Sequence, residues 1–143
     1  MTDRPLRATI SLRGIIRDGG GDVLVVRRAS DGEWELPGGR LDHDEDAVPG
    51  LEREIAEETG LTVDVGPPVH ATAWRNDDDR GRFGVYYPCT TEVRTVSLSG
   101  EHVEYAWDDA ATAADRLGAA GACAVERATD DAVRAAPASV ELR

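Results

Sequence analysis

Three glutamates, Glu54, Glu57 and Glu58, lie three and four positions apart near the end of a segment with helical periodicity. On a helix this spacing brings their carboxylates to one face, where each like-charged pair costs about 0.2–0.5 kcal/mol. Glu57 and Glu58 also fall in the last turn, where the negative end of the helix dipole disfavours anions. A hard divalent cation such as Mg²⁺ or Mn²⁺ would offset this repulsion, because it prefers carboxylate oxygens. The spacing therefore indicates a candidate metal site.

An acid-rich chain also makes acid-rich helices, so the three glutamates alone are equally compatible with a solvated surface. The wider pattern separates the two interpretations. Two glycines, one arginine and four glutamates stand at fixed offsets: Gly39, Glu45, Arg53, Glu54, Glu57, Glu58 and Gly60. A pattern this long is far more specific than a short glycine motif, so it favours function over coincidence.

This pattern resembles the signature of the Nudix hydrolases, G-x5-E-x7-R-E-U-x-E-E-x-G-U, in which U is a bulky aliphatic residue. Every specified position is met, with Ile55 and Leu61 at the two U positions. The hairpin ending at Arg28, the segment Trp34–Gly39 and the segment Glu101–Trp107 also look like the family. We therefore expect one Nudix domain over residues 1–136 and a C-terminal tail over residues 137–143.

The resemblance implies an α/β/α sandwich around a mixed sheet, with the motif forming a loop–helix–loop that holds Mg²⁺, or Mn²⁺ in its place. It implies hydrolysis of a pyrophosphate linkage in a nucleoside diphosphate derivative by water that attacks phosphorus. Nucleoside triphosphates, including oxidised ones, are the first expectation, and ADP-ribose-like nucleotides follow closely. The alternative is a non-catalytic domain that senses a nucleotide, but such members typically lose motif glutamates and none is lost here.

Roles at the metal site can be carried over by position. Glu57 and Glu58 resemble the central metal ligands, and Glu54 resembles a ligand or a base beside them. Glu101 lies six residues before Trp107, where some relatives keep a further metal-binding or basic glutamate on a mobile loop. Glu104 is an alternative to Glu101 in that role.

Other motif residues resemble those that organise the site. Gly38 would offer its backbone carbonyl to the metal, and Arg53 would orient the carboxylates by ion pairing. Arg28, at the end of the second expected strand, either contacts a substrate phosphate or forms a surface ion pair. The structural positions of the motif are Gly39, Glu45, which braces the loop, and Gly60.

Aromatic residues on the expected strands have two interpretations. Trp74, Phe83 and Tyr86 either stack on a nucleobase or, as is more usual on strands, pack in the core and across strands. The three histidines have no mutual spacing that indicates a metal triad. His102 is the one of interest, because it directly follows Glu101.

The motif helix is expected over residues 45–59. Asp44 is a suitable N-cap and Gly60 a suitable stop. Ala47, Leu51 and Ile55 recur at every fourth position and predict its buried stripe.

The remaining elements follow from alternation, apolar runs and turn residues. We expect strands at 8–17, 23–26, 69–74, 82–89 and 103–107, a short extended piece at 34–39, and helices at 109–117 and 124–135. Pro88 predicts an edge position for the strand that contains it. Gly118–Gly121 is expected to separate the last two helices.

The charge balance bounds the class of protein. The chain has 143 residues and a net charge of −12, from 28 acidic residues against 16 basic ones that are all arginine. This excess argues against a basic face for nucleic acid polymers or membranes. We expect a small-molecule partner and a cytoplasmic location, since the N-terminus lacks a signal-like apolar stretch. A homodimer is compatible with the sequence, which does not predict the oligomeric state.

The surplus acid itself has two explanations, a GC-rich genome or a salt-filled cytoplasm. We favour the second, because codon bias alone does not make the charge so negative. The sequence therefore predicts a halophilic protein that tolerates molar salt.

Overall fold

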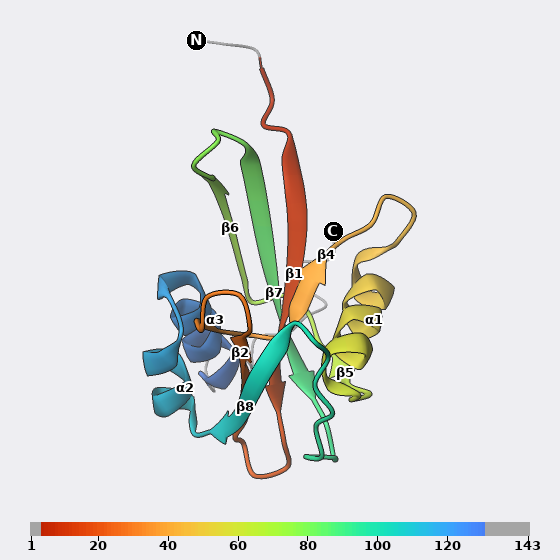
Figure 1. Ribbon diagram of the computed structural model, residues 1–143, viewed down its shortest axis with the longest axis vertical. Helices are drawn as coiled ribbons and strands as arrows, with labels where there is room; N and C mark the ends of the chain where they lie inside the picture. Colours follow the sequence, from red (N-terminus) through yellow and green to blue (C-terminus); the bar gives the residue numbers. More distant parts are fainter. Residues whose placement is uncertain (1–3, 131–143) are drawn as a thin grey trace.

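The computed structural model describes residues 4–130. A mixed eight-stranded sheet lies between helix α1 (Ala47–Thr59) on one face and helices α2 (Ala110–Arg116) and α3 (Ala119–Thr129) on the other (Figure 1). The expected α/β/α sandwich is confirmed. No helix within the described range is long and apolar enough to cross a membrane.

The sheet is organised around its first strand, β1. Its strands are β1 (Ala8–Arg17), β2 (Val23–Arg28), β3 (Trp34–Glu35), β4 (Gly38–Arg40), β5 (Asp64–Val65), β6 (His70–Arg75), β7 (Gly81–Thr90) and β8 (His102–Asp108). β1 pairs in parallel with β7 along its whole length and antiparallel with β4 and the start of β2. β2 in turn pairs antiparallel with β3 and with β8. This pairing places β4 beside α1 and brings the start of β8 to the last turn of that helix.

Two apolar clusters, one on each face of the sheet, hold the layers together. On the α1 side, Leu51 and Ile55 pack with Ile16 and other strand residues; Ala47 is partly buried against them, as the periodicity predicted. On the other face, Val125 of α3 packs with Ile15. Because Ile15 and Ile16 are adjacent and both fully buried, β1 is covered on both sides in its second half.

The motif helix begins later than the sequence predicted. α1 starts at Ala47 with Asp46 as N-cap, and Asp46 makes no side-chain capping bond. Asp44 is therefore not the cap. Residues 42–46 instead form a loop in which the N–H of Asp42 is bound by the side chain of Glu45, so Glu45 lies outside the helix. Gly60 ends the helix in the left-handed conformation, as expected.

The prediction for Pro88 was wrong, since β7 is an interior strand. β7 pairs with β1 on one side and with β6 and β5 on the other. The carbonyl of Pro88 accepts a bond from Gly66, in the segment that joins β5 to β6. On the β5 and β6 side, strand pairing of β7 is interrupted at Pro88, between the residues that pair with β6 and those that pair with β5. This gap accommodates a residue without an N–H.

The last two helices are closer together than predicted. α3 starts at Ala119 and includes Gly121, so only residues 117 and 118 separate α2 from α3. The end of the helix predicted at 124–135 and the tail predicted at 137–143 lie outside the described residues.

Candidate active site

Glu58 is the most buried acid of the motif. It lies in the last turn of α1 with only 4% of its surface exposed. The backbone N–H of Gly38, in β4, donates a hydrogen bond of 3.1 Å to its Oε1. Burial raises the pKa of Glu58 to about 7, and nearby Glu35 and Glu54 act in the same direction, against Gly38 and Arg13. A carboxyl with this pKa exchanges protons near neutral pH.

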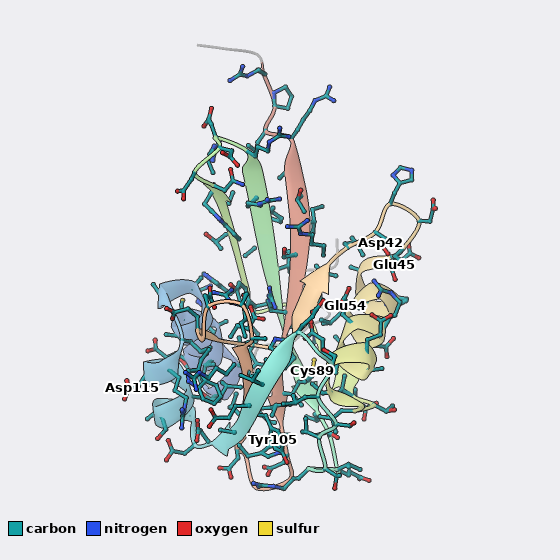
Figure 2. All side chains as sticks on the ribbon, viewed as in Figure 1. Asp42, Glu45, Glu54, Cys89, Tyr105 and Asp115 are labelled. Atoms are coloured by element: carbon teal, nitrogen blue, oxygen red, sulfur yellow. The ribbon has the colours of Figure 1, made fainter. Side chains whose placement is uncertain are left out.

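Glu54 lies one turn earlier on α1 and faces β4. Figure 2 shows it between the helix and that strand, where a Cβ on Gly39 would lie 2.5 Å from Glu54 Oε2. A side chain at position 39 would therefore displace the carboxylate of Glu54. Burial raises the pKa of Glu54, with contributions from Glu57 and Glu101, while Arg53 lowers it.

Arg53 connects the acids of the motif. Its guanidinium donates to both carboxylate oxygens of Glu45, to Glu57 Oε2 at 3.0 Å and to Glu54 Oε1 at 3.3 Å. The hydrogen bonds from Arg53, and one from the N–H of Asp42, lower the pKa of Glu45 to about 2. Glu45 and Asp42 lie at the loop that leads into α1 (Figure 2). Arg53 thus connects Glu45, in the loop, with Glu54 and Glu57 on the helix, and the roles expected for Glu45 and Arg53 stay predictions.

The three helix glutamates differ in exposure. The side chain of Glu57 is 59% exposed, that of Glu54 is 20% exposed, and Glu58 is almost completely buried. Exposure therefore decreases from Glu57 to Glu54 to Glu58, and Glu58 is the one bonded to β4.

Glu101 joins the site from another part of the chain. One carboxylate oxygen of Glu58, one of Glu101 and one ring nitrogen of His102 lie within 4.8 Å of one another. Glu54 and Glu57 are not members of this close group. Glu104, the alternative to Glu101, instead pairs with Arg27 at 3.2 Å. The structure thus brings Glu101, rather than Glu104, to Glu58.

Glu35 is a site residue that the sequence analysis did not single out. Its carboxylate is within 3.5 Å of Arg13 Nη1, 3.2 Å of Arg28 Nη1 and 2.8 Å of His102 Nε2. A lone acid between Trp34 and Leu36, in an otherwise apolar extended piece, was the available signal. Its partners come from β1, β2 and β8, so the pairing of the sheet had to be known first.

A cavity of about 360 Å³ opens beside Glu35. Its lining includes Arg13, Arg28, Trp34, Glu35, Trp74 and Tyr86. Arg28 lines this cavity and also pairs with Asp31 at 2.8 Å, so both interpretations of Arg28 have a structural basis. Trp74 is 42% exposed, and its ring lies above Gly84. Phe83 is not part of this lining.

The donor set suits a hard divalent cation. Arg53 pairs with Glu54 and Glu57 but is shared with Glu45, and Arg13 lies near Glu58, so the acids of the cluster outnumber these two guanidinium groups. Added positive charge would therefore stabilise the cluster. The Gly38 carbonyl accepts a long bond of 3.4 Å from Arg13, and its N–H is taken by Glu58. Carboxylates and a backbone carbonyl are the ligand types that Mg²⁺ and Mn²⁺ prefer.

A family model and two curated proteins match this chain. Residues 7–127 match the model of the NUDIX domain. A MutT-like protein of Streptomyces ambofaciens is 34% identical over 106 residues, which are 74% of this chain and 66% of that protein. An octanoyltransferase of Myxococcus xanthus is 33% identical over 66% of this chain and 28% of its own length. The chain thus spans less than two thirds of these curated relatives.

A solved structure agrees with these matches. The crystal structure of a MutT protein from Methanosarcina mazei Go1 superposes with a TM-score of 0.76 at 28% identity, covering 88% of this chain and 96% of that one.

Proposed function

We infer the function of this chain from the fact that it belongs to the Nudix family, whose domain model matches residues 7–127. We propose that it hydrolyses a pyrophosphate linkage in a nucleoside diphosphate derivative. One observation carries the proposal: Glu58 of α1 meets Glu101 and His102, and His102 contacts Glu35, which lines a cavity together with arginine and aromatic side chains. Pyrophosphate hydrolysis requires both a cluster of anionic metal ligands and a place for the nucleoside.

We propose that Glu57, Glu58 and Glu101, with the carbonyl of Gly38, hold Mg²⁺ or Mn²⁺, and that Glu54 acts beside them as a further ligand or as the base. When bound, the cation neutralises the phosphate oxygens and lowers the pKa of a coordinated water. Arg53 keeps Glu54 and Glu57 in place through the hydrogen bonds described above. Because the protein has a net charge of −12, a polyanionic substrate is expected to arrive with a cation.

A carboxylate of the site would accept the proton of the attacking water. Glu54 suits this role because its pKa is raised and its carboxylate is half-buried next to β4. The water oxygen forms a bond to phosphorus, the bridging P–O bond breaks, and the leaving phosphate takes that electron pair. Glu101 is the second candidate base, because it also lies at the cluster.

The cavity supports a nucleotide as the substrate. Arg13 and Arg28, which pair with Glu35, offer guanidinium donors to a phosphate, and Trp34, Trp74 and Tyr86 supply aromatic surface for a base. We propose nucleoside triphosphates, including oxidised ones, as the first class to test. ADP-ribose-like nucleotides are the second.

The test measures the release of phosphate and pyrophosphate from nucleoside triphosphates and from ADP-ribose-like nucleotides. Each substrate is assayed with Mg²⁺ and then with a chelator. We expect turnover of at least one nucleotide that the chelator abolishes. Glu58→Gln should lose that turnover, whereas Glu52→Gln, an equal charge change at an exposed position of α1, should retain it. Hydrolysis that is insensitive to the chelator, or absent from both classes, would contradict the proposal. Labelled water would identify the phosphorus that is attacked.

A further inference from the structure

His102 is a buried histidine with one satisfied ring nitrogen. Its side chain is 1% exposed, and its Nε2 lies 2.8 Å from Glu35 Oε2. Within residues 4–130, its Nδ1 is buried and has no hydrogen-bond partner. Leaving a buried polar atom unpaired is unfavourable, so this nitrogen requires an explanation.

Glu35 determines which nitrogen of His102 carries the proton. Its carboxylate also pairs with Arg13 and Arg28, and a carboxylate flanked by two guanidinium groups can only accept hydrogen bonds. The Nε2 of His102 must therefore be the donor. In the neutral ring Nδ1 then carries a free lone pair, in the tautomer that a metal-binding histidine adopts when a carboxylate holds its other nitrogen.

The surroundings of His102 supply two more ligands. A ring nitrogen of His102 and carboxylate oxygens of Glu58 and Glu101 lie within 4.8 Å of one another. Ligands on opposite sides of an ion are about 4–4.5 Å apart when each bond is near 2.1 Å, so small side-chain adjustments would bring all three to one ion. Nδ1 is the nitrogen that can bind without breaking the bond to Glu35.

The backbone fixes these three residues to one another. The N–H of Ser99 donates to the carbonyl of Glu58, and the N–H of His102 donates to the carbonyl of Ser99. Glu101 is held in turn, because its carbonyl accepts a bond from Ala29. The end of α1 and the start of β8 are therefore tied together at this point, which pre-organises the three donors.

We propose that Nδ1 of His102 is a metal ligand together with the carboxylates of Glu58 and Glu101. The site would then hold a first-row transition ion such as Mn²⁺ or Zn²⁺ in preference to Mg²⁺, because imidazole favours these ions over Mg²⁺. The inference deepens the proposed function, since Glu58 and Glu101 are also carboxylates of the proposed activating site. It assigns to this chain a nitrogen ligand that the motif itself does not contain.

The test is pulsed electron paramagnetic resonance of the full chain loaded with Mn²⁺, which detects the nitrogen of an imidazole bound directly to the ion. We expect a ¹⁴N coupling in the wild type that changes to ¹⁵N when histidine is labelled. It should disappear in His102→Gln and remain in His43→Gln, whose histidine is exposed in the loop before α1. The affinity for Mn²⁺ should fall about tenfold or more in His102→Gln, with a much smaller change for Mg²⁺.

The wild-type spectrum decides the matter even if His102→Gln does not fold. Absence of any nitrogen coupling in the loaded wild type overturns the inference, as does a coupling that persists in folded His102→Gln. Cation-dependent hydrolysis without nitrogen coupling would leave the proposed function standing and remove the histidine ligand. Nitrogen coupling without hydrolysis would support the histidine ligand and remove the proposed function.

Discussion

The N–H of Gly38 donates a hydrogen bond of 3.1 Å to Oε1 of Glu58, twenty residues further along the chain. This bond connects β4 to the last turn of α1 and holds a buried carboxylate at the centre of the candidate site. It also allows the charge of Glu58 to be removed without removing the contact, because a glutamine oxygen can accept the same bond.

Glu58→Gln is therefore expected to keep the fold and lose most of the turnover. Removing one of the proposed anionic ligands from the cluster should lower kcat by about a hundredfold or more. Steady-state assays in saturating Mg²⁺ measure the loss, and circular dichroism checks the fold. Glu52→Gln is the matched control on the same helix. Turnover near that of the wild type in Glu58→Gln would remove Glu58 from the metal site.

The raised pKa of Glu58 also predicts how the metal-free protein responds to pH. Its pKa is about 7 in the folded protein, against an ordinary value of 4.5, so the fold favours the protonated form. The contribution of Glu58 to the free energy of unfolding is fully present below about pH 4.5. It is lost as pH rises through about 7, and the loss is up to about 3 kcal/mol. Glu58→Gln should remove most of the loss.

Urea unfolding in the presence of a chelator measures this difference. At pH 8 the metal-free variant should be more stable than the wild type, and near pH 4.5 the two should agree. If the gap between them does not widen with pH, Glu58 does not titrate as described. Saturating Mg²⁺ should reverse the order at pH 8, because the cation stabilises the ionised carboxylate.

Arg53 is expected to act by positioning carboxylates. Arg53→Lys keeps the positive charge but loses the planar fork that binds both oxygens of Glu45 and reaches Glu54 and Glu57. The Mg²⁺ concentration for half-maximal activity should rise by about tenfold or more, while the KM for the nucleotide at saturating Mg²⁺ stays nearly constant. An unchanged Mg²⁺ requirement would show that Arg53 does not organise the ligands.

The local parts of this site were predictable from sequence and the non-local parts were not. The spacing along α1, its buried stripe and the stop at Gly60 follow from helical geometry alone. The contact of Glu35 with His102 depends on β2 pairing with both β3 and β8, which no local pattern specifies. For the same reason Pro88 indicated an edge strand, because the interruption between β5 and β6 is made by residues distant in sequence.

Two acids outside the candidate site, Asp108 and Asp109, have local partners. Asp108 pairs with Arg116 at 2.7 Å, and Asp109 caps α2 by accepting a bond from the N–H of Thr112. Composition could not separate these acids from the exposed turn at residues 77–79.

Trp74 is expected to contribute to substrate binding. It is a cavity-lining aromatic on β6 with 42% of its surface exposed, so little of the core depends on it. Loss of base stacking in Trp74→Ala should raise KM for the nucleotide by about tenfold, since stacking on an aromatic is worth about 1–3 kcal/mol, and kcat should change little. Tyr105→Ala is the control: Tyr105 is 41% exposed on β8 and does not line the cavity. Equal KM values for the two variants would exclude stacking on Trp74.

The net charge of −12 predicts a dependence of stability on salt. Repulsion among exposed acids is screened as the Debye length falls from about 10 Å at 0.1 M to about 3 Å at 1 M salt. The free energy of unfolding should therefore rise with KCl, and a continued rise in molar salt would favour adaptation to a salt-filled cytoplasm. Asp77 and Asp78 are exposed in the β6–β7 turn, so Asp77→Asn with Asp78→Asn should reduce the gain at low salt. Full stability in dilute buffer, with no gain from KCl, would show that the acid excess reflects codon usage and that its charges are too far apart to repel strongly.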